Sequence, residues 1–78
     1  MVKVQFKSSN EIIVIKDATV VQKEMNIYNV TLPINGSVSR EDFQGVKLWI
    51  DENPSLDAKV SNMSGNGGKT FVTLMVLL

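Results

Sequence analysis

The sequence predicts a small α+β domain, with an antiparallel or mixed sheet of five to six strands and one helix, residues 40–52, packed on one face. The first observation is a C-terminal run, residues 71–78, that is apolar except for Thr73. It is too short to cross a bilayer, which takes about 20 helical residues, and its β-branched content favours a strand. We expect this strand at the centre of the sheet, buried on both faces.

The other two observations are the two periodicities. Several segments alternate apolar and polar residues, as half-buried strands do, and one segment between a capping serine and a proline has helical spacing. With 78 residues the chain makes one domain, residues 1–78, burying about 60% of its unfolded surface. Eight basic residues balance eight acidic ones, which is not the charge of a nucleic-acid binder.

The N-terminal half predicts strands. Residues 2–6 alternate apolar side chains with Lys3 and Gln5, and lysines on the outer face suit an edge strand. Residues 11–16 hold an apolar run flanked by two charged residues, which is a second candidate for a central strand. Asp17 marks a turn or a bulge, so residues 11–23 are either two strands or one bent strand.

A reversal at residues 24–26 predicts a hairpin with the strand that follows. Tyr28, Val30 and Leu32 share one face of that strand. Pro33 has no N–H for a ladder, and we expect pairing to end there.

Residues 40–52 have two interpretations. Ser39 caps a helix that Pro54 stops, and one face of it then carries Phe43, Val46, Trp49 and Ile50. Gly45 opposes a helix, at a cost of about 1 kcal/mol in its interior. In the alternative, residues 46–51 form a strand with Val46, Leu48 and Ile50 inward. The cap and the proline favour the helix.

Residues 56–61 alternate as a half-buried strand and run into the glycine-rich residues 62–68, which predicts a hairpin with the final strand. Residues 65–70 end in Gly-Lys-Thr, as a phosphate-binding loop does, but Met63 stands where the first glycine belongs and a strand follows. We therefore expect no nucleotide site. A weak anion site formed by Gly67, Gly68 and Lys69 is the remaining ligand hypothesis.

The sequence offers little for catalysis. It has no histidine and no cysteine, so the common general base and thiol nucleophile are missing, and zinc would have only carboxylates. The adjacent acids Glu41–Asp42 and Asp51–Glu52 are typical of solvated charge. We expect no enzyme activity, no catalytic residue, no metal and no cofactor.

A protein contact is the better hypothesis. Either interpretation of residues 40–52 leaves one large apolar side chain outward, Leu48 in the helix or Trp49 in the strand. Asp51 and Glu52 would form an acidic rim, which predicts a partner with a basic surface.

The leading interpretation is a non-enzymatic protein-binding module, an inhibitor or adaptor of a larger protein, typical of small accessory proteins of bacteria and phages. One alternative is a homo-oligomeric structural subunit of an assembly, and another is a small-anion binder. The sequence has neither a signal-peptide core nor a membrane span, so we expect a cytoplasmic protein that binds no membrane and no nucleic acid.

Overall fold

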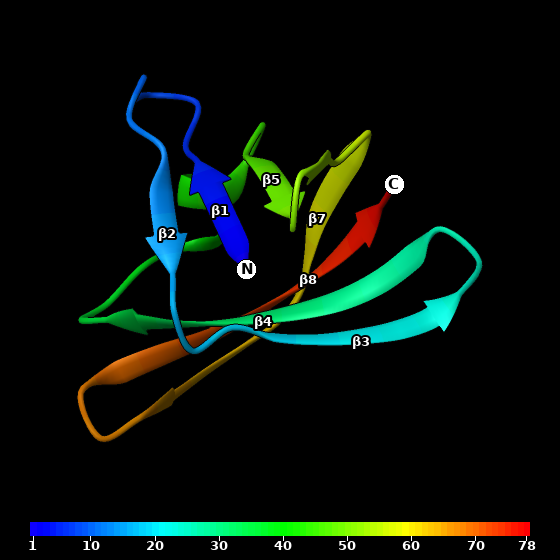
Figure 1. The fold of residues 1–78 in the computed structure, drawn as a ribbon. Helices are drawn as coiled ribbons and strands as arrows, with labels where there is room; N and C mark the ends of the chain where they lie inside the picture. Colours follow the sequence, from blue (N-terminus) through cyan, green and yellow to red (C-terminus); the bar gives the residue numbers. More distant parts are fainter.

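The computed structural model describes residues 1–78 as two antiparallel four-stranded sheets stacked in two layers (Figure 1). Sheet A has the order β2-β1-β5-β6, and sheet B has the order β3-β4-β8-β7. The strands of sheet A are β1 (Val2–Gln5), β2 (Ile13–Ile15), β5 (Lys47–Ile50) and β6 (Asn53–Pro54). The strands of sheet B are β3 (Thr19–Glu24), β4 (Ile27–Asn35), β7 (Asp57–Asn66) and β8 (Lys69–Leu77).

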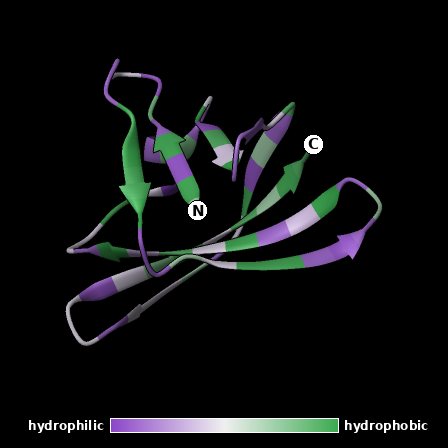
Figure 2. Ribbon diagram, viewed as in Figure 1, coloured by the Kyte–Doolittle hydropathy of each residue, from purple (hydrophilic) through white to green (hydrophobic).

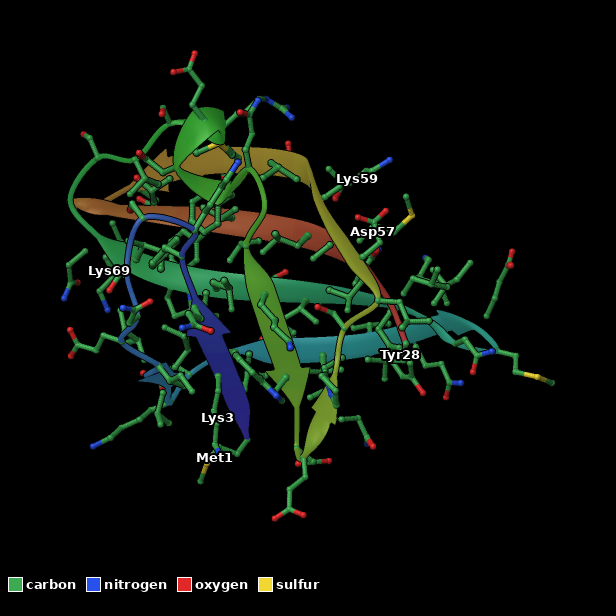
Figure 3. All side chains as sticks on the ribbon, turned by 90° about the horizontal axis from the view of Figure 1, so that it is seen from above. Met1, Lys3, Tyr28, Asp57, Lys59 and Lys69 are labelled. Atoms are coloured by element: carbon green, nitrogen blue, oxygen red, sulfur yellow. The ribbon has the colours of Figure 1, made fainter.

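The chain crosses between the sheets three times, from β2 to β3, from β4 to β5 and from β6 to β7. The second crossing contains one turn of 3-10 helix, η1 (Arg40–Phe43). Strands of sheet A run across those of sheet B (Figure 3). Sheet B is the longer layer, and its β3–β4 hairpin extends beyond sheet A (Figure 1).

The core between the layers is entirely apolar. Alternate residues of each strand point inward, which gives the alternating hydropathy along β1 and β4 in Figure 2. Phe43 of η1 closes one side of the core, where its ring meets Phe6 edge to face at 5.3 Å between centroids. The ten buried residues are Val2, Val4, Val30, Leu32, Phe43, Val46, Leu48, Val72, Leu74 and Val76.

The predicted helix at residues 40–52 is wrong, and with it the α+β fold class. The cap exists, since the Asp42 carboxylate accepts a hydrogen bond of 2.8 Å from the Ser39 N–H. The turn that it starts ends at Phe43, because Gln44 is already extended, with ψ of 127°, and Gly45 after it takes a left-handed conformation with φ of 69°. A regular helix cannot continue through that conformation.

The alternative strand for this segment is confirmed. Val46 and Leu48 are buried, and Ile50 packs against the core. Val46 and Leu48 are two residues apart, the spacing at which side chains of a strand point to the same face. Burying them beside β1, with which β5 pairs, outweighs the helical spacing of Phe43 and Trp49. The structure has eight strands in two sheets, where the sequence predicts five to six strands in one.

Strand β8 is central, as predicted, because it pairs with both β4 and β7. Burial on both of its faces is wrong. Val72, Leu74 and Val76 are buried, whereas Met75 and Leu77 are 48% and 41% exposed. No layer covers the outer face of sheet B, and the apolar run therefore serves only one core.

The edge and centre of sheet A are also exchanged relative to expectation. β1 lies between β2 and β5, and β2 is an edge strand. Residues 11–23 hold two strands, which the turn at Lys16–Asp17 sends into different sheets. The lysine on β1 is therefore an outer-face residue of a central strand.

Strand β4 continues through Pro33 to Asn35, contrary to expectation. Pairing with β3 does end before the proline, at Thr31, while pairing with β8 continues past it. The proline thus lies where β4 is open on one side, a position in which a missing N–H is tolerated. The predicted hairpins at residues 24–26 and between the last two strands are both present.

Candidate protein-binding surface

The outer face of sheet A carries a row of residues that face each other across four strands. Lys3 of β1 lies opposite Val14 on one side and opposite Trp49 on the other, and Trp49 lies opposite Pro54. Directly paired residues point to the same side of a sheet, and their neighbours Val4 and Leu48 are in the core. We call the outward set of Lys3, Val14, Lys47, Trp49 and Pro54 the Trp49 face.

Trp49 lies in the middle of this face and is half-buried. The Lys47 ammonium nitrogen lies 5.3 Å from the centroid of its ring, within cation–π range. Lys3 lies beside the ring across the ladder, and alternation with the buried Val2 and Val4 turns its side chain to the outer face. The aromatic group is therefore flanked by two cations, and the sequence had suggested acids around it.

Asp51 and Glu52 form the two-residue turn of the β5–β6 hairpin. Asp51 has a φ of 56°, a left-handed conformation that Asp adopts more readily than most residues. Its carboxylate lies 2.8 Å from the Met1 ammonium, and its N–H donates to the Met1 carbonyl at 2.8 Å. The hydrogen bond and the positive charge of that ammonium lower the pKa of Asp51.

The hairpin turn explains why two adjacent acids are tolerated at residues 51 and 52, which the helix interpretation did not explain. At the end of a helix they would face an unfavourable dipole, but in a hairpin turn there is none. Both side chains remain exposed at one end of the Trp49 face. The Asp51 carboxylate forms an ion pair with the Met1 ammonium, and Glu52 has no ion-pair partner.

Leu48, the contact residue expected from the helix, lies in the core with no exposed surface. Its N–H donates to the Ser55 hydroxyl at 3.1 Å, and its carbonyl accepts from the Ser55 N–H at 2.7 Å. These bonds fix β5 against the segment that follows β6. A buried side chain cannot contact a partner, so Leu48 is not part of the candidate surface.

The fold separates the acids between residues 41 and 57 into three places, of which the predicted acidic rim, Asp51 and Glu52, is one. Glu41 and Asp42 lie on η1, and Asp51–Glu52 lie at the end of sheet A. Asp57 lies in sheet B with Lys59 at 3.7 Å, far from Met1 and Lys3 in Figure 3. These acids do not form one continuous charged surface.

Gly67 and Gly68 form the tight turn between β7 and β8, both with positive φ, and Lys69 begins β8. A strand follows the lysine, so the strand–loop–helix arrangement of a phosphate-binding loop is absent. The Gly36 N–H donates to the Gly68 carbonyl at 2.9 Å, and the Thr70 hydroxyl donates to the Gly36 carbonyl at 2.7 Å. These bonds hold the turn against the end of β4. The anion site remains a hypothesis to which the structure adds no ligand group.

Sequence analysis missed a second surface, at the edge strands β2 and β3. The turn at Lys16–Asp17 joins the two strands directly. Periodicity identifies strands but does not tell which strand is outermost, and only the sheet order shows this edge. Five large apolar side chains there are between 39% and 50% exposed: Ile12, Ile13, Val14, Val20 and Val21.

No three acidic side chains gather as a metal site would require. A hollow of about 790 Å³ is open to solvent between the β1–β2 loop and η1, and its charged lining residues are Lys7, Glu41 and Asp42.

Comparison with known proteins adds no family. No protein-family model, no curated protein and no solved structure matches the chain. None of the helical structure in the chain has the length and apolar character needed to cross a membrane.

Proposed function

We propose that the chain is a non-enzymatic protein-binding module that contacts a larger protein through the Trp49 face. One observation supports this most directly. A tryptophan stands in the middle of a sheet face that no other part of the chain covers, in a cross-strand row with the exposed residues Val14 and Pro54. Tryptophan at the centre of a patch with a polar rim is the composition of binding hot spots.

The charges around Trp49 define the partner's chemistry. Lys3 and Lys47 flank the ring, so the partner should offer an apolar group over Trp49 and carboxylates beside it. Glu52, at the end of the face, is available for a single basic group. The proposed partner is therefore mainly acidic, which revises the expectation of a basic surface.

The role of inhibitor or adaptor belongs to this proposal, as does a cytoplasmic location in a bacterium or its phage. The absence of histidine and cysteine supports a function in binding over one in catalysis. Without cysteine the chain forms no disulfides, which agrees with the proposed cytoplasmic location, where disulfides are rare.

Capture from a lysate of the source organism tests the proposal. The chain lacks cysteine, so a Ser64→Cys variant can be biotinylated at one site on the outer face of sheet B, away from the Trp49 face. We expect a captured protein that is lost with Trp49→Ala and with Lys3→Glu/Lys47→Glu. The control Met75→Ser, which removes an exposed apolar group from sheet B, should retain it.

Each variant is first compared with wild type by urea unfolding, because Trp49 also packs on its own sheet. Lys3→Glu/Lys47→Glu changes only side chains on the outer face and separates loss of contact from loss of fold. Retention of the captured protein by both Trp49-face variants, with loss in Met75→Ser, would place the interface on sheet B and refute the proposal.

A further inference from the structure

Two asparagines of the chain are followed by glycine, and each stands at the end of a strand. Asn35 ends β4 and Asn66 ends β7, and both side chains are exposed. Lys69 lies opposite Asn35 on one side of β8 and opposite Asn66 on the other. The two asparagines therefore have the same following residue, similar exposure and the same neighbouring cation.

An asparagine before glycine can react with its own backbone. The nitrogen of the following residue can reach the carbon of the side-chain amide and close a five-membered ring with it. Glycine makes this approach easy, since it has no Cβ to obstruct it. The reaction needs the nitrogen free, because a hydrogen-bonded N–H keeps its proton and its position until the structure opens locally.

The N–H groups of the two glycines differ in their hydrogen bonds. The Gly36 N–H donates to the Gly68 carbonyl at 2.9 Å, and the Gly36 carbonyl accepts from the Thr70 hydroxyl at 2.7 Å. The Gly67 N–H, in the exposed turn before β8, has no hydrogen-bond acceptor. The nitrogen beside Asn66 is thus free to react, whereas the nitrogen beside Asn35 is held.

We propose that Asn66 is a site of deamidation and that the fold protects Asn35. The Gly67 nitrogen gives its proton to water and bonds to Cγ of Asn66. The bond from Cγ to Nδ2 then breaks, and Nδ2 takes a proton from water and leaves as ammonia. Water opens the resulting succinimide ring at either C–N bond and leaves a carboxylate and ammonium. Opening at the new bond gives aspartate, and opening at the original peptide bond gives isoaspartate.

The two products should affect the β7–β8 hairpin differently. Aspartate places a carboxylate opposite Lys69, and opposite charges across paired strands are stabilising. Isoaspartate adds one carbon to the main chain just before a turn of two residues, Gly67 and Gly68. Loop length sets the register of a hairpin, so we expect isoaspartate to loosen this end of the two strands. This modification does not rest on the proposed function.

Peptide mapping of the folded chain tests the proposal. The chain is incubated at neutral pH in water enriched in heavy oxygen and digested in ordinary water, so that deamidation during digestion is not counted. Trypsin separates the two asparagines into residues 24–40 and 60–69, and electron-transfer fragmentation distinguishes aspartate from isoaspartate. We expect Asn66 to react about tenfold or more faster than Asn35, since two hydrogen bonds hold Gly36.

Two comparisons separate the effect of the fold from that of the local sequence. In concentrated urea both glycine N–H groups are free, and the two asparagines should react at similar rates. Thr70→Val removes one of the bonds that hold Gly36, and it should speed the reaction of Asn35 while leaving that of Asn66 unchanged. For the effect on the hairpin, the melting temperature of the purified isoaspartate chain should be lower than those of wild type and Asn66→Asp.

Faster reaction of Asn66 in the folded chain, with similar rates in urea, would establish the site. An equal or faster reaction of Asn35 in the folded chain would overturn the proposal. The same ratio of rates in urea would also overturn it, because the local sequence would then explain the difference. So would an Asn66 that stays intact in the folded chain while it reacts in urea. Failure of Thr70→Val to speed the reaction of Asn35 would refute its protection by this hydrogen bond.

Discussion

Val4 and Leu48 face each other across the β1–β5 ladder, and neither side chain is exposed to solvent. This pair joins the N-terminal strand to the segment that the sequence assigned to a helix. Because Leu48 points inward, alternation turns Lys47 and Trp49 outward. The position of Trp49, and with it the candidate surface, follows from the burial of its neighbour.

Truncating Leu48 should therefore cost stability. Leu48→Ala removes a fully buried side chain, and we expect a loss of about 2 to 5 kcal/mol in the free energy of unfolding. Leu56→Ala is the matched control, since Leu56 is 78% exposed and should change stability by less than about 0.5 kcal/mol. Urea unfolding measures both. Equal losses for the two variants would contradict the strand at residues 47–50.

Substitution of Gly45 by alanine distinguishes helix from strand, because the two structures predict opposite changes in the free energy of unfolding. In a helix, Gly45→Ala would stabilise the protein by about 1 kcal/mol. With a φ of 69° the alanine is strained, and its Cβ would lie 3.1 Å from Lys7 Cδ. We expect destabilisation of about 1 to 2 kcal/mol, measured by urea unfolding.

The control for that variant is Gly65→Ala, where φ is not positive and the nearest atom to the added Cβ is 3.9 Å away. It should be close to neutral. Lys7→Ala/Gly45→Ala removes the side-chain contact and should keep most of the loss, because the strain lies in the backbone. Stabilisation by Gly45→Ala would restore the helix interpretation.

Asp51 predicts a small dependence of stability on pH. The Met1 ammonium lowers the pKa of Asp51 below its ordinary value of 3.8. A carboxylate with a depressed pKa contributes stability above its unfolded pKa and loses that contribution as the pH falls through the folded pKa. The melting temperature of wild type should thus be slightly higher than that of Asp51→Asn at about pH 6, and the two should be equal at about pH 2.

Acetylation of the Met1 amino group is the control, because it removes the same ion pair from the other side. The acetylated protein and Asp51→Asn should melt alike at both pH values. Asn tolerates the left-handed turn conformation, so backbone strain does not confuse the comparison. If the difference in melting temperature between wild type and Asp51→Asn grows as the pH falls, the ion pair is not its cause.

Local patterns in the sequence predict most of the strands. The alternation in residues 28–32, the turn at residues 24–26 and the two glycines before Lys69 each describe a feature that the structure contains. These features depend on residues close together in the chain, and sequence periodicity records such relations directly.

The layer arrangement could not be predicted in the same way. A run such as residues 71–77 looks buried on both faces, but exposure of Met75 and Leu77 depends on whether another layer covers sheet B. Residues 11–16 look central and lie at an edge, because sheet order is set by pairing between distant segments. For the same reason, the sequence does not show that β3 is an open edge of sheet B.

The helix error has a local cause. The cap at Ser39 is present, and Phe43, Val46 and Trp49 do repeat at helical spacing, but the same segment also alternates from Val46 to Ile50. Both patterns fit, and the pairing of β5 with β1 decides between them. Once the strand is known, the outward position of Trp49 follows, so this part of the candidate site was within reach of the sequence.

Site-specific photo-crosslinking in cells of the source organism tests the central claim most directly. A photoreactive phenylalanine analogue replaces Lys3, which adjoins Trp49 across the ladder, or Asn62, on the outer face of sheet B, in otherwise identical chains. The Trp49 face predicts a covalent adduct with a larger protein from position 3 and none from position 62. An adduct from position 62 with none from position 3, or no adduct from either position, would contradict it.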